Sequence, residues 1–381
     1  HRRLGPEIAG LVDALDEALG DARGDGVRRA EVVALVRAHY VPGRPLAQAF
    51  AGLLAAVFAG DGLLVLDPRD ARVAALAAPT YARALADAAP VEAALRARGA
   101  TLAAAGFDEQ IPVRVACSLL FFHERDATGP RFRLQRSSGA WTLAGTGATV
   151  ADAELERCLA RDPLRFSTSA LLRPLVQDAL LPTVAYVGGP AELSYFAQLG
   201  PLYEHFAQPM PLVVPRARFR ILDVATRRRL AQLGLSADDA AASRTKLLTR
   251  LATSRPGAPA AESLRRLVAE RVAPAVDDVT RAAVAADAGL ARAAARTRAT
   301  IDRALGRFVA RYARDVSAHD GVTIARLDEV QNALVPNGVP QERLYGWPSP
   351  AARLGAGALK RLVFERLAAA PFSTALQDLT P

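Results

Sequence analysis

The sequence contains few cysteines, few aromatic residues and almost no lysine. Only Cys117 and Cys158 among its 381 residues are cysteines, which excludes a disulfide framework and a metal site built from cysteines alone. No apolar run approaches the roughly 18 residues that a membrane-spanning helix needs, and no signal peptide is visible. We therefore expect a cytoplasmic protein with free thiols, no metal site and no membrane association.

Positive charge is in excess, and arginine carries nearly all of it. The chain has 48 basic and 39 acidic residues, but Lys246 and Lys360 are its two lysines. The basic residues are spread along an alanine-rich chain, and aromatic residues make up only 6% of it. A nucleic-acid groove would interleave basic and aromatic side chains. We expect a solvated surface and no nucleic-acid partner; a steep loss of affinity with salt would indicate the alternative.

The first hundred residues are predicted to be mainly helical. Apolar residues recur at helical spacing over Ile8–Leu19, Glu31–Ala38 and Pro45–Phe58. The short run Leu63–Leu66 is apolar on both faces and stops at Asp67-Pro68, which favours a buried parallel strand. Alanine-rich helices are expected to follow.

A different pattern covers Gln110 to Gly145. Short segments with apolar alternation occupy Val113–Phe122, Arg131–Gln135 and Trp141–Leu143, and Asp126–Pro130 has the composition of a turn. This arrangement predicts an antiparallel meander inserted between elements of a parallel sheet.

The chain after about Leu222 is predicted to be helical. Apolar residues step by three and four over 272–290 and again over 294–312, with Gly289 at the natural place for a reversal. We expect an antiparallel helical hairpin or coiled-coil arm, preceded by a break at Ser254–Pro259. Pro274 and Gly321 are points where the helices are expected to be interrupted.

The segment Leu181–Arg216 reads as one βαβ unit. Thr183–Val187 is a β-prone run, Gly188-Gly189 allows a tight turn, and Pro190 suits the first position of a helix. A second strand is predicted at Leu212–Val214. Such a unit is right-handed in nearly all proteins.

The glycine turn of this unit is the candidate ligand site. Open parallel sheets bind ligands beyond the carboxyl ends of their strands, and a helix N-terminus attracts anions. Gly188 and Gly189 would let a ligand approach the backbone, and Glu192 would be stabilised in the first helical turn or would hold a substrate amine. The alternative is ordinary turn chemistry, because a single Gly-Gly-Pro turn occurs without a ligand as well.

Several motifs resemble those of the BshC family. The segments that carry the resemblance, in order, are AGDGLLVLDPRD at Ala59–Asp70, FSTSALLRPLVQDAL at Phe166–Leu180, Leu181–Arg216, and LVPNGVPQER at Leu334–Arg343. The resemblance implies an α/β fold: an incomplete Rossmann-like parallel sheet with a small inserted antiparallel meander, plus a C-terminal helical coiled-coil arm. We expect residues 1–222 to form the core, with a connecting subdomain at about 100–160, and residues 223–381 to form the helical part.

The resemblance also implies a function. It indicates a cysteine ligase that adds cysteine to glucosaminyl-malate to complete bacillithiol, and a homodimer formed through the coiled coil. Amide synthesis needs an activated carboxyl group. ATP is the obvious source, but no segment resembles a Walker A loop and the Gly-Gly-Pro turn selects no nucleotide, so activation in another way stays open. The matching positions that would bind substrate are Arg173, Gly188, Gly189, Glu192, Tyr195, Gln198 and Arg216.

The roles of these positions have alternatives. Arg173 or Arg216 would bind malate carboxylates through a bidentate fork, or would form structural ion pairs. Tyr195 and Gln198 would contact the ligand, or would belong to the packed and polar faces of the helix.

One departure from the family concerns the start of the chain. Family members begin with a strand and a Gly-Gln-Gln-type loop, followed by an acidic and histidine motif, and none of these is found here. The five histidines stand in no comparable setting, so no catalytic residue is assigned. We expect the sequence, which begins at His1, to lack the first part of its Rossmann core. The competing hypothesis is a non-catalytic coiled-coil protein that serves in dimerisation or interaction.

Overall fold

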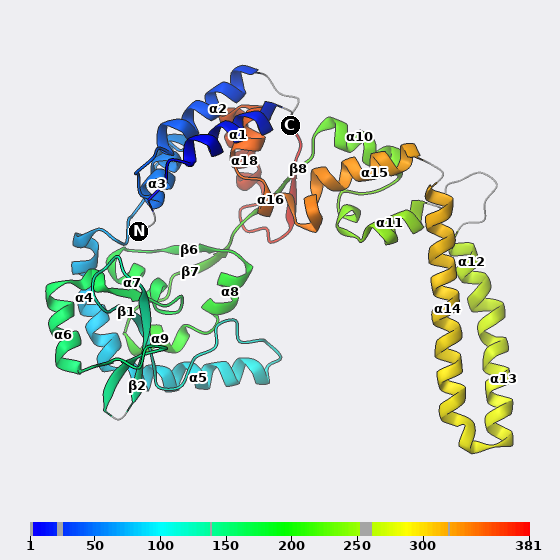
Figure 1. Cartoon of the computed structure of the whole chain (residues 1–381), viewed down its shortest axis with the longest axis horizontal. Coiled ribbons are helices and arrows are strands. Elements are labelled where there is room, and N and C mark those ends of the chain that lie inside the picture. The colour runs from blue at the N-terminus through cyan, green and yellow to red at the C-terminus, as the bar shows by residue number, and fades with distance from the viewer. Residues whose placement is uncertain (1–2, 21–25, 138, 252–260, 319–320) are drawn as a thin grey trace. The chain divides into compact units, whose positions relative to one another are not determined.

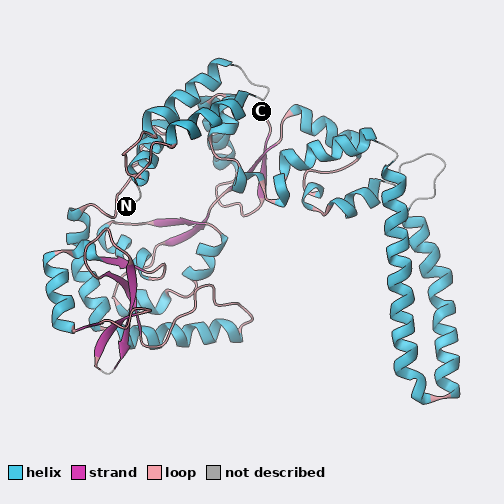
Figure 2. Cartoon of the chain, viewed as in Figure 1, coloured by secondary structure: helices cyan, strands magenta, loops and turns pink. Residues whose placement is uncertain are grey.

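The computed structural model describes residues 3–20, 26–137, 139–251, 261–318 and 321–381 (Figure 1). They form two compact units: residues 1–218 with 365–375, and residues 219–364 with 376–381. Helices dominate, and the strands are short (Figure 2). Among the helices described, none is long and apolar enough to cross a membrane.

Helices fill the first hundred residues, as predicted. Their bounds are α1 Ile8–Gly20, α2 Gly26–His39, α3 Leu46–Val57, α4 Ala71–Ala86 and α5 Ala88–Ala104. The start of α4 is fixed by Asp70, whose carboxylate accepts a hydrogen bond from the backbone N–H of Arg72 at 2.9 Å. The hydrogen bond from the Arg72 side chain is the largest of the effects that lower the pKa of Asp70 to about 2.

The strand predicted at Leu63–Leu66 is wrong. The segment lies between α3 and α4 in irregular conformation and pairs with no strand in the described ranges. Its side chains are exposed, Leu64 by 92%. Its two-sided apolar pattern is that of a strand in the middle of a sheet, but a strand also needs neighbours whose N–H and C=O groups pair with its own.

The predicted antiparallel meander is confirmed and is larger than expected. Five strands form one sheet in the order β4-β3-β2-β1-β5, and every neighbouring pair is antiparallel. Their bounds are β1 Cys117–His123, β2 Arg131–Ser137, β3 Ala140–Leu143, β4 Thr149–Val150 and β5 Phe166–Thr168. The helix α6, Asp152–Arg161, connects β4 to the 3₁₀ turn before β5.

The predicted βαβ unit is also confirmed. β6, Ala185–Gly188, and β7, Leu212–Pro215, pair in parallel, and α8, Pro190–Phe196, and α9, Gly200–His205, connect them. The two helices are separate because Gly200-Pro201 interrupts the apolar helical segment. The helix α7, Leu172–Leu180, precedes β6.

One hydrophobic core joins the antiparallel sheet to the βαβ unit within the first unit. Its largest fully buried side chains include Phe122 of β1, Leu95 of α5, Leu175 of α7, Phe196 of α8 and Tyr203 of α9. Burying such side chains stabilises a protein by about 1.5–3 kcal/mol each relative to exposure. The elements on either side of the glycine turn therefore pack on this core.

The second unit has its own core, formed by α10, α11 and α15. The bounds of its elements are β8 Arg218–Ile221, α10 Val224–Leu233, α11 Arg244–Leu251, α15 Gly321–Leu334, α16 Gln341–Leu344, α17 Pro348–Leu354, α18 Ala356–Ala369, which extends into residues of the first unit, and β9 Leu376–Leu379. In the Pro-Asn-Gly…Gln-Glu-Arg segment, Asn337 and Gly338 both have positive φ and turn the chain. Gln341 then accepts a hydrogen bond from Ile221 N at 2.7 Å, and Glu342 accepts one from Phe219 N at 3.2 Å. This motif therefore holds β8.

A long helical hairpin extends from the second unit, as predicted (Figure 1). One side comprises α12, Ala261–Leu267, a π-helical turn at Val268–Val272 and α13, Ala273–Ala286; the other side is α14, Ala291–Ala318. The reversal includes Gly289, and the π-helical turn falls just before Pro274. An ion pair between Arg298 and Asp277 joins the two sides. The break predicted at residues 254–259 lies outside the described residues.

Candidate functional site

The glycine turn lies where two parallel strands end side by side. Gly188, the last residue of β6, is in register with Pro215, the last residue of β7. The N–H of Arg216 donates to the Gly188 carbonyl at 2.7 Å, which extends the pairing by one step. Gly189 and Arg216 therefore share the carboxyl edge of this sheet, where open α/β sheets bind ligands.

Neither glycine is required by backbone conformation, and only Gly188 is required by space. Gly189 has φ −74°, and Gly188 is not among the residues with positive φ. A Cβ atom at Gly188 would lie 3.2 Å from Glu192 Cβ and 3.3 Å from Tyr186 Cε1. A Cβ atom at Gly189 would lie 3.4 Å from the Arg216 guanidinium nitrogen Nη2. This is an ordinary contact distance, so the Arg216 guanidinium lies directly beside the turn at Gly189.

Glu192 caps the helix that follows the turn. Its Oε2 accepts a hydrogen bond from the Gly189 N–H at 2.8 Å, and its Oε1 accepts one from the Tyr186 hydroxyl at 2.6 Å. The Tyr186 hydrogen bond, and next the Gly189 N–H, hold the pKa of Glu192 below its usual range. Glu192 is therefore an anion at neutral pH, and it occupies the place at the helix tip that an external anion would take.

Arg173 reaches the same group from α7. It donates to the hydroxyls of Tyr186 at 2.7 Å and Tyr195 at 2.8 Å, and its guanidinium lies 3.9 Å from the Glu192 carboxylate. We call these four residues the Arg173 network. Its arginine side chain remains 41% exposed, so it keeps access to solvent. Burial, and next the hydrogen bond to Glu192, raises the pKa of Tyr186, which keeps its phenol neutral.

The structure brings six of the seven predicted site residues together. Arg173, Glu192 and Tyr195 are linked through the network, and Arg216 contacts the turn at Gly188-Gly189. Gln198 is placed differently.

Gln198 is completely buried, and its amide group is used by the backbone of another segment. Its Oε1 accepts a hydrogen bond from Ile111 N, and its Nε2 donates to Ile111 O, both at 3.1 Å. Its Nε2 also lies 3.3 Å from the Glu109 carboxylate. The side chain therefore anchors the segment before β1 to the end of α8.

Sequence reasoning missed Tyr186, the residue at the centre of the network. Its hydroxyl donates to Glu192 and accepts from Arg173, and its ring packs against Phe196 in a tilted arrangement, 4.4 Å between centroids. A signal was present: Tyr186 is the one hydroxyl-bearing side chain of β6 and stands two residues before Gly188.

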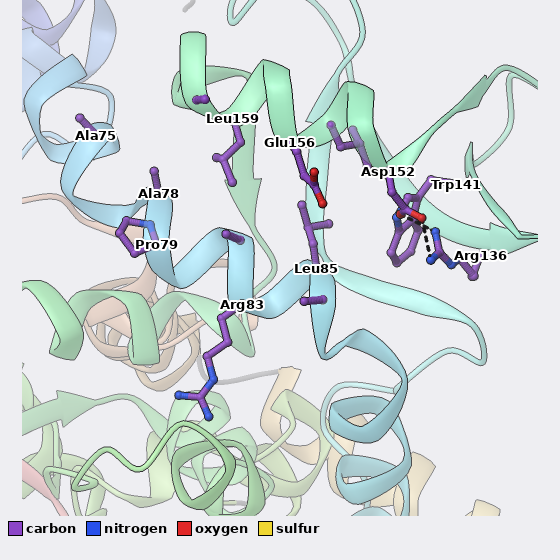
Figure 3. A pocket seen from close by; sticks show the side chains of 14 residues that line it. Ala75, Ala78, Pro79, Arg83, Leu85, Arg136, Trp141, Asp152, Glu156 and Leu159 are labelled. Atoms are coloured by element: carbon purple, nitrogen blue, oxygen red, sulfur yellow. Dashed lines mark hydrogen bonds and ion pairs between the residues drawn. The ribbon is translucent and has the colours of Figure 1, made fainter.

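Two hollows lie elsewhere on the first unit, and neither is lined by the seven predicted residues. A groove of about 850 Å³ runs between α4 and α6, with alanine and leucine side chains along it and the Arg136–Asp152 ion pair beside Trp141 at one end (Figure 3). A smaller cavity of about 320 Å³ opens on the antiparallel sheet. In the described ranges, no cluster of three or more His, Cys, Asp or Glu could hold a metal ion.

Family models and relatives agree on the relationship of the chain. The model described as "Bacillithiol biosynthesis BshC, N-terminal Rossmann-like domain" matches residues 4–217, and the one described as "Bacillithiol biosynthesis BshC, C-terminal coiled-coil domain" matches residues 219–370. Relatives named "Putative cysteine ligase BshC" include those of Koribacter versatilis, 33% identical over 95% of this chain and 65% of the relative, and Symbiobacterium thermophilum, 31% identical over 95% and 66%. A third, from Salinibacter ruber, is 37% identical over 61% of this chain and 41% of the relative.

The chain thus spans about two-thirds of the length of the relatives that match nearly all of it. The two family models adjoin and leave only short ends uncovered, which agrees with the Rossmann-like core and the helical arm described above. The chain belongs to the BshC family of bacillithiol biosynthesis.

Proposed function

We propose that this chain carries the substrate-binding turn of a ligase that joins cysteine to glucosaminyl-malate through an amide bond. The observation that supports it is the position of the Arg216 guanidinium against Gly189, with Arg173 and the Glu192 carboxylate next to the same turn. Glucosaminyl-malate presents two carboxylates and one amine. A site with two arginines and one anionic glutamate has matching charges.

Each group at the turn has a proposed role. Arg216 and Arg173 bind the malate carboxylates, since guanidinium forks match carboxylate geometry. Glu192 holds the amino group as an ion pair, because its lowered pKa makes it a better anionic partner than proton acceptor. Gly188 and Gly189 leave room for the ligand. Tyr195 orients Arg173, and Gln198 orients the segment at Ile111.

The proposed reaction requires an activated cysteine. The glucosamine ammonium held by Glu192 first releases one proton to solvent. The free amine then attacks the carboxyl carbon of cysteine, a C–N bond forms, and a C–O bond breaks as the oxygen leaves with the activating group. The nitrogen releases a second proton to solvent as the amide forms. We propose ATP as the source of the activating group, and no residue is assigned as the catalytic base.

We further propose that the protein is a homodimer assembled through the hairpin. No residue of α13 is buried in the single chain. Val279 of α13 and Phe308 of α14 are large apolar side chains that are exposed. A two-helix hairpin with such residues gains by packing on another helical surface.

Calorimetric titration with glucosaminyl-malate tests the proposed binding site. Arg216→Gln should weaken binding by about tenfold or more, because it removes a charge-assisted hydrogen-bond donor. Arg157→Gln is the matched control: it removes the same charge from an exposed position on α6. Absence of binding by the unmodified chain, or an equal loss in both variants, would refute this site.

Mass spectrometry separates the ligase from its alternative. The chain is incubated with glucosaminyl-malate and cysteine, with and without ATP, and with a cysteine thioester as a pre-activated donor. Bacillithiol formed only with ATP or the thioester supports the ligase. A dimer that neither binds glucosaminyl-malate nor forms product in any mixture favours the non-catalytic interaction protein.

A further inference from the structure

The smaller cavity of the first unit has the features of a separate anion site. It has a volume of about 320 Å³ and is bounded by β1, β2, β5 and the segment before β1. Arg114, Arg131 and Arg133 line it, and no carboxylate is among its lining residues. Ligand sites span roughly 300–1,000 Å³, so a cavity of this size suits a small molecule or one end of a larger one.

The two arginines of β2 are held in place by an aromatic ring. Arg131 and Arg133 are two residues apart on a strand and therefore project from the same face. Their guanidinium carbons lie 4.7 and 4.9 Å from the centroid of the Phe121 ring, which belongs to β1. Stacking of this kind fixes the plane of a guanidinium and leaves its N–H groups available in that plane.

Within the described part of the chain, Arg114, Arg131 and Arg133 form no ion pair. Glu92 does not line the cavity; its carboxylate accepts a hydrogen bond from Ala116 N at 2.6 Å and pairs with Arg96 at 3.6 Å. Three positive groups gathered at one cavity repel one another, and a bound anion relieves that repulsion.

Neutral polar groups complete the cavity. Ser118 and Ser169 are buried lining residues whose hydroxyl oxygens accept hydrogen bonds from Leu120 N at 3.0 Å and Leu172 N at 3.3 Å. Each hydroxyl proton remains able to donate to a ligand. Cys117 also lines the cavity, and burial raises the pKa of its thiol, so it adds no negative charge. The lining therefore offers donors and positive charge together.

We propose that this cavity binds a small dianion, either a phosphoryl group or a pair of carboxylates. Planar guanidinium forks bind both with two parallel hydrogen bonds. The Phe121 ring gives the ligand an apolar surface beside the charged groups. The proposal does not depend on the function assigned to the glycine turn, because none of the seven residues of that site lines the cavity.

The segment that forms one wall connects this cavity to the rest of the unit. Ile111 lines the cavity, and both its backbone N–H and its carbonyl are bonded to the buried Gln198 side chain. Occupation of the cavity therefore acts on a segment whose position is set by the end of α8.

Titrations of the whole chain with inorganic phosphate and with L-malate test the proposal and distinguish the two sources of charge. Arg131→Gln with Arg133→Gln should weaken binding of the preferred anion by about a hundredfold, and Arg133→Lys should weaken it by about tenfold, because lysine keeps the charge and loses the fork. Arg157→Gln with Arg292→Gln removes two exposed arginines and should change binding less than about twofold.

Circular dichroism melts of all variants verify that each is folded, and Arg133→Lys provides a mild second variant if the double substitution is not. Binding of phosphate alone, or of malate alone, with the expected loss supports the site and identifies its ligand. If neither anion binds at millimolar concentration, or if the control pair loses as much affinity, the proposal is overturned.

Discussion

At the scale of single residues, Glu192 accounts for the charge of the turn. A glycine turn before a helix offers unsatisfied N–H groups, and in this protein the chain supplies its own carboxylate to one of them, at Gly189. The expected anion-binding role of the helix tip therefore passes to the arginines beside it. Glu192 becomes a fixed negative group between two positive ones, Arg173 and Arg216.

The contribution of Glu192 to stability should depend on pH. Its pKa in the folded chain is lowered, so its stabilisation is complete above its unfolded-state pKa of about 4.3 and is lost as pH falls through the lower folded value. Glu192→Gln should cost about 1 kcal/mol at pH 7, discounted because the side chain is partly exposed, and much less at the lowest pH at which the chain stays folded. Urea unfolding at several pH values measures this difference. Glu156→Gln, on an exposed face of α6, should show no such trend.

The two glycines should respond differently to a methyl group. Gly188→Ala places Cβ against Glu192 Cβ and the Tyr186 ring at 3.2 and 3.3 Å, and should cost about 1–3 kcal/mol by overpacking. Gly189→Ala meets the end of Arg216 at 3.4 Å and a Glu192 carboxylate oxygen at 3.6 Å, both ordinary contacts, and keeps an ordinary φ, so stability should change by less than about 1 kcal/mol. Thermal melts compare the two. If Gly189→Ala is the more damaging, the geometry of the turn is not as described.

Residue types at this site were predictable, but their contacts were not. Gly188, Gly189 and Glu192 follow from a local strand–turn–helix pattern. Tyr186 was not predicted for two reasons. Its place in the strand pattern is that of any apolar residue, and its role depends on a hydrogen bond from Arg173, which belongs to the helix α7. Sequence spacing carries no information about such a meeting.

At the scale of elements, Gln198 joins two segments that are far apart in sequence. Gln198→Leu would leave the partly buried N–H and C=O of Ile111 without their partners and should cost about 1–3 kcal/mol. Hydrogen exchange at the Ile111 amide should accelerate in this variant. Gln232→Leu, at an exposed position on α10, is the matched control and should leave that amide unchanged. Equal exchange in both would exclude the anchoring role.

Elements were predicted well where their signal is local. The pair β6–β7 carries its own turn, connecting helices and partner strand within one segment, so the whole unit follows from the order of residues. Leu63–Leu66 has the composition of a strand but no partner strand among the described residues, and composition cannot supply one. The strand β5 was missed for the opposite reason: its three residues are too short for a periodic pattern, and it is defined by pairing with β1.

At the scale of the whole molecule, the two units differ in how they obtain their stability. The first unit encloses a large core that supports both the glycine turn and the smaller cavity lined by Arg114, Arg131 and Arg133. The second unit has a compact core around α10, α11 and α15, and its hairpin buries little of its own surface. Heptad spacing predicted the hairpin correctly, because consecutive helices joined by a short turn need no distant information.

The exposure of Phe308 could not be predicted from the heptad spacing. This residue belongs to the apolar pattern of α14, yet it is 62% exposed in the single chain. A second helix covers only part of a helical surface, so the remaining apolar residues are available to another copy.

Sedimentation equilibrium tests the dimer through this residue. The unmodified chain should be a dimer at micromolar concentration, and Phe308→Ser should raise the dimer dissociation constant by at least about tenfold, since burying a phenylalanine is worth about 1.5–3 kcal/mol. Phe107→Ser is the matched control, because Phe107 is 64% exposed and belongs to the first unit. A monomeric unmodified chain, or equal dissociation of both variants, would show that the exposed side of the hairpin does not mediate dimerisation. Dissociation by Phe308→Ser alone would assign the arm its role in assembly, because the two substitutions remove the same apolar surface from different units.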